Sequence, residues 1–348
     1  MATSRIAPEH AEVNRLVADL GIPAAGNRLG VAAILYTYRC TIACRHCCFG
    51  SCGARPAVRM NAEQVVAHLR SLHELGRVVH IAGGECMMYW DELRTALAAA
   101  KEAGVTPHFI ETNGSFADSD ETVRRRIEEL ADLGVVGLLL SADPYHQTFV
   151  PPDNVIRLRR IAREMLGPLN VWCTDEPDAR IAEFARIARG EQLLRDYVRA
   201  NPPMLVGTAH RRLRKFLDSY PLNEMPCDVG WRREHTGRDC AVEFRWETMW
   251  EIHVDPYDSI QTNCGVILGN AAQTRLAGLV ERGPEKANEI VRILATEGPF
   301  GLADFARDRH GFDPPETACS KCDLCYTTRK FLRPFHPDIL GPEEVYDR

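Results

Sequence analysis

Three cysteines near the start of the chain are spaced in a way that suits an iron–sulfur cluster. Cys40, Cys44 and Cys47 form a C-x3-C-x2-C pattern. Their thiolates can hold three of the four irons of a 4Fe-4S cluster, because each iron takes one cysteine sulfur from the protein. The fourth iron is then open to an external molecule with amino and carboxyl groups. Zinc is the alternative for these thiolates, since thiolates suit both metals.

Further chemically capable residues follow other apolar runs of the sequence. They occur at Gly83–Glu85, Asn113–Ser115 and Ser141–His146. Two adjacent glycines let the backbone approach a ligand closely, although a double glycine is also common in a strand-to-helix turn. Glu85 can pair with an ammonium group.

Three side chains of the last segment, Asp143, Tyr145 and His146, are candidate catalytic residues. We expect them to face a cavity, where they would position substrate or carry a proton. The alternative is structural, because Asp-Pro commonly opens a turn.

The C-terminal third contains a second set of cysteines. It comprises Cys227, Cys240, Cys264, Cys319, Cys322 and Cys325. Cys240, Cys264 and two of the last three would give four thiolates, enough to saturate one further 4Fe-4S cluster. Cys227 is then a substitute or a spare. Zinc bound by the last three cysteines with a fourth ligand is the alternative.

Strands alternate with helices over the first two thirds of the chain. Strands are predicted at 31–38, 78–82, 108–112, 136–141, 170–174 and 204–208, and helices at 8–20, 61–75, 91–102, 120–133, 154–166 and 179–199. This alternation is typical of parallel strands joined by right-handed crossovers. The class is therefore α/β, as a partial (β/α)6 TIM-like barrel. The motifs above fall at the C-terminal strand ends, where such barrels carry their chemistry.

The alternation stops near residue 220, which predicts a division of the chain. We expect an N-terminal extension at 1–30, the partial barrel at 31–220 and a smaller domain at 221–348. Strand-like runs at 242–246 and 249–254 predict a hairpin, with Cys240 before one arm and Cys264 after the other.

Composition limits the function. The 348 residues are 45% hydrophobic and 26% charged, as in a soluble globular protein. A net charge of −6 and a pI near 6.1 argue against nucleic acid as a partner. No apolar run approaches the ~18 residues of a membrane span, and no export signal precedes the thirteen cysteines. A cytoplasmic protein with metal-bound thiolates is expected.

With these motifs the chain resembles the radical S-adenosylmethionine (SAM) enzymes that carry a C-terminal auxiliary-cluster domain of the SPASM/twitch kind. The resemblance covers roughly residues 31–210 and 225–330. It implies that His46 lies against the adenine and that Gly83-Gly84-Glu85 holds the methionine amino group. It further implies that Asn113, Ser115 and Ser141 help to bind the cofactor. Cys86 departs from the pattern, because the family commonly has proline there.

The resemblance also implies an activity. The reduced cluster would split SAM, and the resulting 5′-deoxyadenosyl radical would take hydrogen from a peptide or a small metabolite. A flavodoxin- or ferredoxin-type protein would supply the electron. One auxiliary 4Fe-4S cluster would assist a net oxidation, dehydrogenation or bond formation, as in peptide or natural-product maturation. Two auxiliary clusters would need about eight ligands, and this region has six cysteines.

Two other functions stay open. One is epimerisation, in which a thiol of Cys48, Cys52 or Cys227 returns a hydrogen atom to the substrate. The other is a non-enzymatic iron–sulfur electron carrier or zinc-binding protein.

Overall fold

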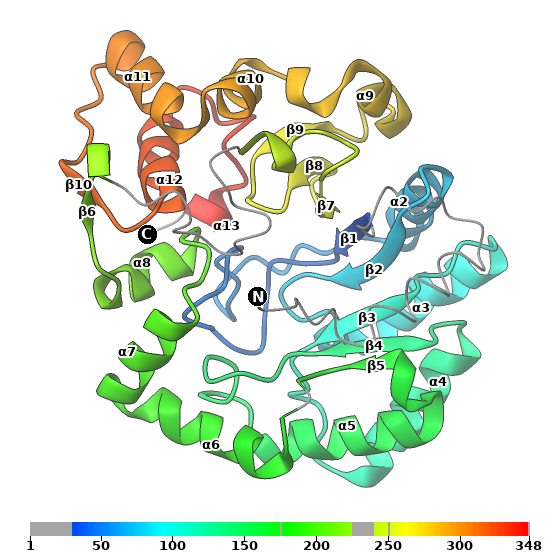
Figure 1. Ribbon diagram of the computed structural model, residues 1–348. Coiled ribbons are helices and arrows are strands. Elements are labelled where there is room, and N and C mark those ends of the chain that lie inside the picture. The colour runs from blue at the N-terminus through cyan, green and yellow to red at the C-terminus, as the bar shows by residue number, and fades with distance from the viewer. Residues whose placement is uncertain (1–29, 175, 225–239, 250, 347–348) are drawn as a thin grey trace, which may run out of the picture.

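The computed structural model describes residues 30–174, 176–224, 240–249 and 251–346. Its centre is one continuous sheet with the strand order β5-β4-β3-β2-β1-β7-β8-β9 (Figure 1). The strands from β5 to β7 in this order run parallel, whereas β8 and β9 run antiparallel. The predicted α/β class, with a mostly parallel central sheet, is confirmed.

The strands of this sheet are β1 (Val31–Leu35), β2 (Val78–Ala82), β3 (Phe109–Thr112), β4 (Gly137–Leu140), β5 (Val171–Trp172), β7 (Glu251–Val254), β8 (Ser259–Thr262) and β9 (Ile267–Asn270). A separate two-stranded sheet pairs β6 (Tyr220–Pro221) with β10 (Thr317–Ala318). The helices are α2 (Ala62–Glu74), α3 (Trp90–Glu102), α4 (Asp120–Asp132), α5 (Pro152–Leu166), α6 (Asp178–Arg189), α7 (Glu191–Ala200), α8 (Thr208–Leu213), α9 (Leu276–Arg282), α10 (Glu289–Thr296), α11 (Gly298–His310), α12 (Lys321–Leu332) and α13 (Glu343–Tyr346).

Helix α2 shows how local sequence sets these boundaries. Asn61 caps its first turn by accepting from the Gln64 backbone N–H, and the Gln64 side chain accepts from the Asn61 N–H. This capping box satisfies two backbone donors that a helix start leaves free. Val65, Leu69 and Leu72 then form a buried face against the sheet.

The sixth parallel strand is not where the sequence analysis placed it. Residues 204–207 form a loop that leads into α8 at Thr208, and the sixth parallel position belongs to β7, which pairs with β1. Pro202 and Pro203 directly precede this loop and have no N–H for a ladder. Gly207 has φ +59°, a left-handed conformation that suits a turn.

Other boundaries also differ. The helix expected at 179–199 is divided at Gly190 into α6 and α7. The strand expected at 242–246 is a short 3-10 helix at Cys240–Glu243 followed by turns, so the hairpin is formed by β7 and β8. The helix expected at 8–20 lies outside the described residues.

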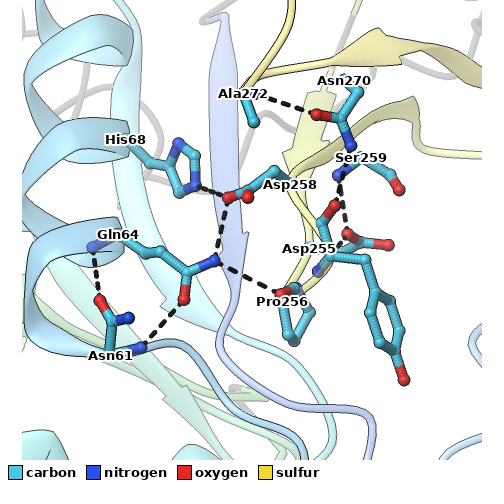
Figure 2. Close-up of polar contacts among 10 residues, drawn as sticks. Asn61, Gln64, His68, Asp255, Pro256, Asp258, Ser259, Asn270 and Ala272 are labelled. Carbon is cyan, nitrogen blue, oxygen red and sulfur yellow. Dashed lines mark hydrogen bonds and ion pairs between the residues drawn. The ribbon is translucent and has the colours of Figure 1, made fainter.

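The strands after residue 220 extend the sheet of the barrel across the expected domain boundary. A polar joint ties the β7–β8 turn to α2 (Figure 2). The Asp258 carboxylate accepts from Gln64 Nε2 at 3.0 Å and lies 2.8 Å from His68 Nε2. Asp255 in the same turn accepts from the backbone N–H of Tyr257 and Ser259.

The larger helices lie in two groups around the sheet. Helices α2 to α6 lie outside the parallel strands, whereas α10, α11 and α12 pack together beyond β9 (Figure 1). Within the described ranges, no helix combines the length and the apolarity needed to span a bilayer.

Candidate active site

The three cysteines after β1 line one cavity of about 160 Å3. Burial raises the pKa of Cys40 and of Cys47, and the nearby Cys44 raises both pKa values further. Two N–H donors face the sulfurs: Asn113 Nδ2 lies 3.6 Å from Cys40 Sγ, and the Ser51 backbone N lies 3.3 Å from Cys47 Sγ. Such donors stabilise thiolates, so the three cysteines fit an anionic iron–sulfur cluster.

Close backbone contacts hold the cysteine loop in place. Gly83 has φ +127°, and a Cβ there would lie 2.6 Å from the Thr37 carbonyl oxygen. A Cβ on Gly84 would lie 2.0 Å from the Arg39 carbonyl oxygen. The Glu85 N–H donates to that oxygen at 3.0 Å. The two glycines therefore let the end of β2 pack against the strand end that leads into the cysteines.

The segment before α8 also packs against the cysteine loop, at Gly207. A Cβ there would lie 2.3 Å from the Cys48 carbonyl oxygen. The Thr208 N–H donates to the Cys47 carbonyl at 2.9 Å. Sequence reasoning missed this contact, because it assigned the segment to a strand.

Glu85 joins two strand ends through its side chain. Its carboxylate is buried and accepts from the Met87 N–H, the Thr112 hydroxyl and the Asn113 N–H. It is not among the residues that line the cavity, whereas Gly83 and Gly84 are. The carboxylate joins the ends of β2 and β3, and its pairing with an ammonium group stays a prediction.

The segment after β3 reaches the cysteine loop. Asn113 lines the cavity, and its side-chain amide donates to Thr41 Oγ1 at 3.1 Å. Ser115 lies next to the same threonine, with 2.9 Å between the two hydroxyl oxygens. Ser141 lines the cavity from the end of β4. These three predicted cofactor-binding residues lie at adjacent strand ends, around the loop.

Asp143 and His146 form a pair beside Cys44. The Asp143 carboxylate lies 2.7 Å from His146 Nδ1 and 3.9 Å from His46 Nε2. Burial would raise the pKa of Asp143, but the two imidazoles hold it well below its usual range. His146 lines the cavity, and Asp143 and Cys44 hold its pKa well above the ordinary value despite burial. Asp143 therefore positions a histidine that faces the cysteines.

Tyr145 is not placed as expected. It is 5% exposed and does not line the cavity. Its ring stacks on His46 at 4.5 Å between centroids and meets Tyr197 edge-on. Tyr145 thus packs against the ring of His46, and His46 itself lines the cavity. Burial lowers the pKa of His46 to about 4, which keeps the ring neutral.

A rival metal site lies at the same place. Ligand atoms of Cys44, His46 and His146 lie within 4.8 Å of one another. This set would use one thiolate and two imidazoles, and it would leave out Cys40 and Cys47, which line the same cavity.

Sequence reasoning also missed an ionisable group in the barrel interior. Glu111 on β3 lines the cavity, and burial together with Glu251 raises its pKa to about 7. His80 Nε2 lies 3.7 Å from Glu111 and 3.5 Å from Glu251, and His253 lies 3.2 Å from Glu251. The alternation of side chains along β3 could have indicated that Glu111 faces inward.

Cys48 lines the cavity beside this group, whereas Cys52 does not. Burial, Cys47, Glu251 and Glu111 together raise the pKa of Cys48 well above its ordinary value. Its side chain is therefore held as a neutral thiol. Cys86 is buried and its sulfur faces the Glu111 carbonyl, which is a structural position. Cys227 lies outside the described residues.

Four cysteines of the second set come together, from three separate segments of the chain. They are Cys240, Cys264, Cys322 and Cys325. Burial raises the pKa of Cys240 to about 12 and of Cys325 to about 11, with neighbouring thiols of this group adding to each shift. Burial raises the pKa of Cys322, and all three of the other thiols raise it further.

Cys319 is separate from this group. Its sulfur lies 3.3 Å from Ser219 Oγ and 3.6 Å from the Arg214 carbonyl. Its N–H donates to the Asp323 carboxylate. Burial and Asp323 raise its pKa. Of the last three cysteines, Cys322 and Cys325 are therefore the two that lie with Cys240 and Cys264.

Comparison with known proteins shows what this chain is similar to. Residues 34–164 match the Radical SAM superfamily. This match agrees with the radical SAM part of the resemblance seen in the sequence, whereas the SPASM/twitch part stays a prediction. It is 25% identical over 322 residues to the "Putative peptide biosynthesis protein YydG" of Bacillus subtilis (strain 168), covering 86% of this chain and 92% of the relative.

Two solved structures are also similar. BtrN in complex with AdoMet and 2-DOIA is 12% identical, with a TM-score of 0.45, over 80% of this chain and 90% of BtrN. Streptococcus suis SuiB bound to the precursor peptide SuiA is 13% identical, with a TM-score of 0.34, over 80% of this chain and 71% of SuiB.

Proposed function

We propose that this protein is a radical SAM enzyme that abstracts hydrogen from a peptide, with a net oxidation, dehydrogenation or bond formation assisted by one auxiliary 4Fe-4S cluster. The observation that carries the proposal is the presence of two separate thiol groups. Cys40, Cys44 and Cys47 line the cavity, and four others gather around α12. The name of the Bacillus relative, which shares most of its length with this chain, favours a peptide substrate.

When loaded, the first cluster supplies an electron that splits SAM, and the second supplies an electron acceptor. The chain's own residues provide the surroundings for this chemistry. Asn113 and Ser51 donate toward the cysteine sulfurs. His46 and Ser141 offer a ring and a hydroxyl along the cavity wall. His146, held by Asp143, and Glu111 are the groups placed to hold or move a proton.

The auxiliary cluster would be held by Cys240, Cys264, Cys322 and Cys325. Cys322 and Cys325 are three residues apart in α12 and therefore lie on one face of the helix. Cys264 follows β8, and Cys240 lies in the short 3-10 helix before β7. This set supports one auxiliary cluster and gives Cys319 a structural position.

Iron analysis of the anaerobically reconstituted protein tests both clusters. We expect about eight irons per chain, and about four after the Cys40, Cys44 and Cys47 to Ala triple substitution. Cys322→Ser should also lose about four, while Cys319→Ser, on the same segment, should keep all eight. Equal losses in the two serine variants would overturn the ligand assignment.

Reductive cleavage of SAM tests the enzyme class. The reconstituted protein with dithionite and SAM should release 5′-deoxyadenosine, and Cys44→Ala should abolish the release. A protein that holds iron but never cleaves SAM would favour the electron-carrier alternative. Zinc in place of iron at the second set would instead favour a structural zinc site.

Epimerisation is a second candidate, because the Cys48 thiol lines the cavity and is held protonated. In this reaction the S–H bond would break and a new C–H bond would form on the opposite face of the substrate radical. The resulting thiyl radical would need an electron from the external donor and a proton from solvent.

A further inference from the structure

A buried arginine lies next to the second group of cysteines. Arg329 follows Cys325 by four residues and Cys322 by seven, so all three lie along one face of α12. The Arg329 side chain is 1% exposed, and its Nη1 donates to the Cys264 carbonyl at 2.9 Å. The guanidinium therefore touches two of the segments that carry these thiols.

No carboxylate in the described parts of the chain forms an ion pair with Arg329. Its guanidinium carbon lies 5.6 Å from the ring centres of Tyr326 and Tyr346, and its Nε has no hydrogen-bond partner among the described residues. Burial alone would lower the pKa of Arg329, but Tyr346, Cys325 and Cys264 raise it. Among these neighbours, Cys325 and Cys264 are the groups that would carry negative charge as cluster ligands.

A buried cation without a counter-charge costs several kcal/mol. Four thiolates around an oxidised 4Fe-4S core carry a net negative charge, and one further electron makes that charge larger. Arg329 would therefore be neutralised by the cluster. Because the attraction grows with the negative charge, a fixed cation at this position favours the reduced cluster over the oxidised one.

We propose that Arg329 is a positioning residue that supplies the counter-charge of the auxiliary cluster and raises its reduction potential. This inference rests on the proposed function, since it assumes that the second cysteine group holds a cluster. It goes further by naming a residue of the chain that would adjust the cluster for the electron-accepting role proposed above, a role that an oxidative reaction requires and a purely structural cluster does not.

Potentiometric titration tests the inference. The parent protein is the full chain with Cys40, Cys44 and Cys47 all changed to Ala and reconstituted anaerobically, so that the electron paramagnetic resonance signal comes from the auxiliary cluster alone. Arg329→Met should shift the oxidised-to-reduced ratio at least about tenfold toward oxidised, a fall of about 59 mV for one electron. Arg329→Lys keeps the charge and should stay close to the parent. Arg333→Met, one turn further along the helix and partly exposed, is the matched control.

Each outcome decides the question. An unchanged potential in Arg329→Met, or equal shifts in the Met and Lys variants, would overturn the inference. Loss of iron in Arg329→Met alone would support a need for the charge, whereas loss in both variants would overturn it. If the parent itself holds no iron, the proposal of an auxiliary cluster is wrong, and the inference about Arg329 is overturned for that separate reason.

Discussion

Individual residues in the cavity separate the two reactions considered above. Cys48 and Cys52 are four residues apart, yet only Cys48 lines the cavity. Its neighbours Glu111 and Glu251 disfavour the thiolate, and a neutral thiol is the form that can donate a hydrogen atom. The side chain of Cys48 is thus the one described thiol in the cavity that does not belong to the proposed cluster-binding trio.

Solvent labelling tests this role of Cys48. The reaction is run in deuterated buffer with the peptide substrate. Epimerisation predicts one deuterium in the product and at least a roughly 100-fold loss of product in Cys48→Ala, with 5′-deoxyadenosine still formed. Cys52→Ala should behave as the unchanged protein. A product that is two hydrogens lighter, without deuterium and still made by Cys48→Ala, would favour oxidation instead.

At the scale of elements, the cysteine loop depends on backbone contacts from β2 and from the segment before α8. The double glycine was expected to bring the backbone close to a cofactor. Its closest neighbours are the carbonyl oxygens of Thr37 and Arg39, at the end of the strand that leads into the loop. Glycine is therefore required at this position by the fold of the loop itself.

Gly84→Ala is expected to disturb the loop. The added Cβ would lie 2.0 Å from the Arg39 carbonyl oxygen, so backbone must move, at a cost of about 1–3 kcal/mol. Iron at the first site should fall and the anaerobic melting temperature should drop by several degrees. Gly269→Ala is the matched control, because its Cβ would meet nothing within 4 Å. Full iron loading and an unchanged melting temperature in Gly84→Ala would contradict this account.

For the molecule as a whole, the decisive feature is the joint between the first strand and the C-terminal part. Asp255 is fully buried and accepts from the Tyr38 hydroxyl at 2.9 Å and from Gln261 Nε2 at 3.1 Å. It also accepts from two backbone N–H groups of the β7–β8 turn. Tyr38 is two residues from Cys40, so this carboxylate connects the turn to the cysteine loop.

Asp255→Ala should therefore destabilise the protein. It leaves four buried donors without their acceptor, at about 1–3 kcal/mol for each donor that finds no water. A fall of several degrees in the anaerobic melting temperature is expected, together with lower iron at the first site. Asp313→Ala, an exposed aspartate, is the control and should change neither.

The effect of Asp255 should also depend on pH. Burial raises its pKa to about 6. Because the folded pKa lies above the unfolded value, the protonated side chain contributes most below pH ~4, and this contribution is lost as the pH rises through about 6. The loss caused by Asp255→Ala should be smaller at pH 8 than at pH 5.5. A larger loss at pH 8 would show that the carboxylate is stabilised by folding instead.

Short-range sequence patterns were sufficient to predict much of the structure of this protein. The spacing of Cys40, Cys44 and Cys47, the cap at Asn61 and the alternation of strands and helices up to β5 all depend on residues close together in the chain. Local spacing fixes helix caps, side-chain faces and the order of elements, because those properties arise within a few turns or strands. The radical SAM domain could be recognised for this reason.

Only the tertiary structure decided which distant residues meet. It placed β7 rather than residues 204–208 beside β1, turned Glu85 away from the cavity, and separated Cys319 from the other C-terminal cysteines. It also buried Arg329 against Cys264, 65 residues away. Such contacts depend on how the elements pack and on which charges are excluded from water. Neither property is encoded in the spacing of neighbouring residues.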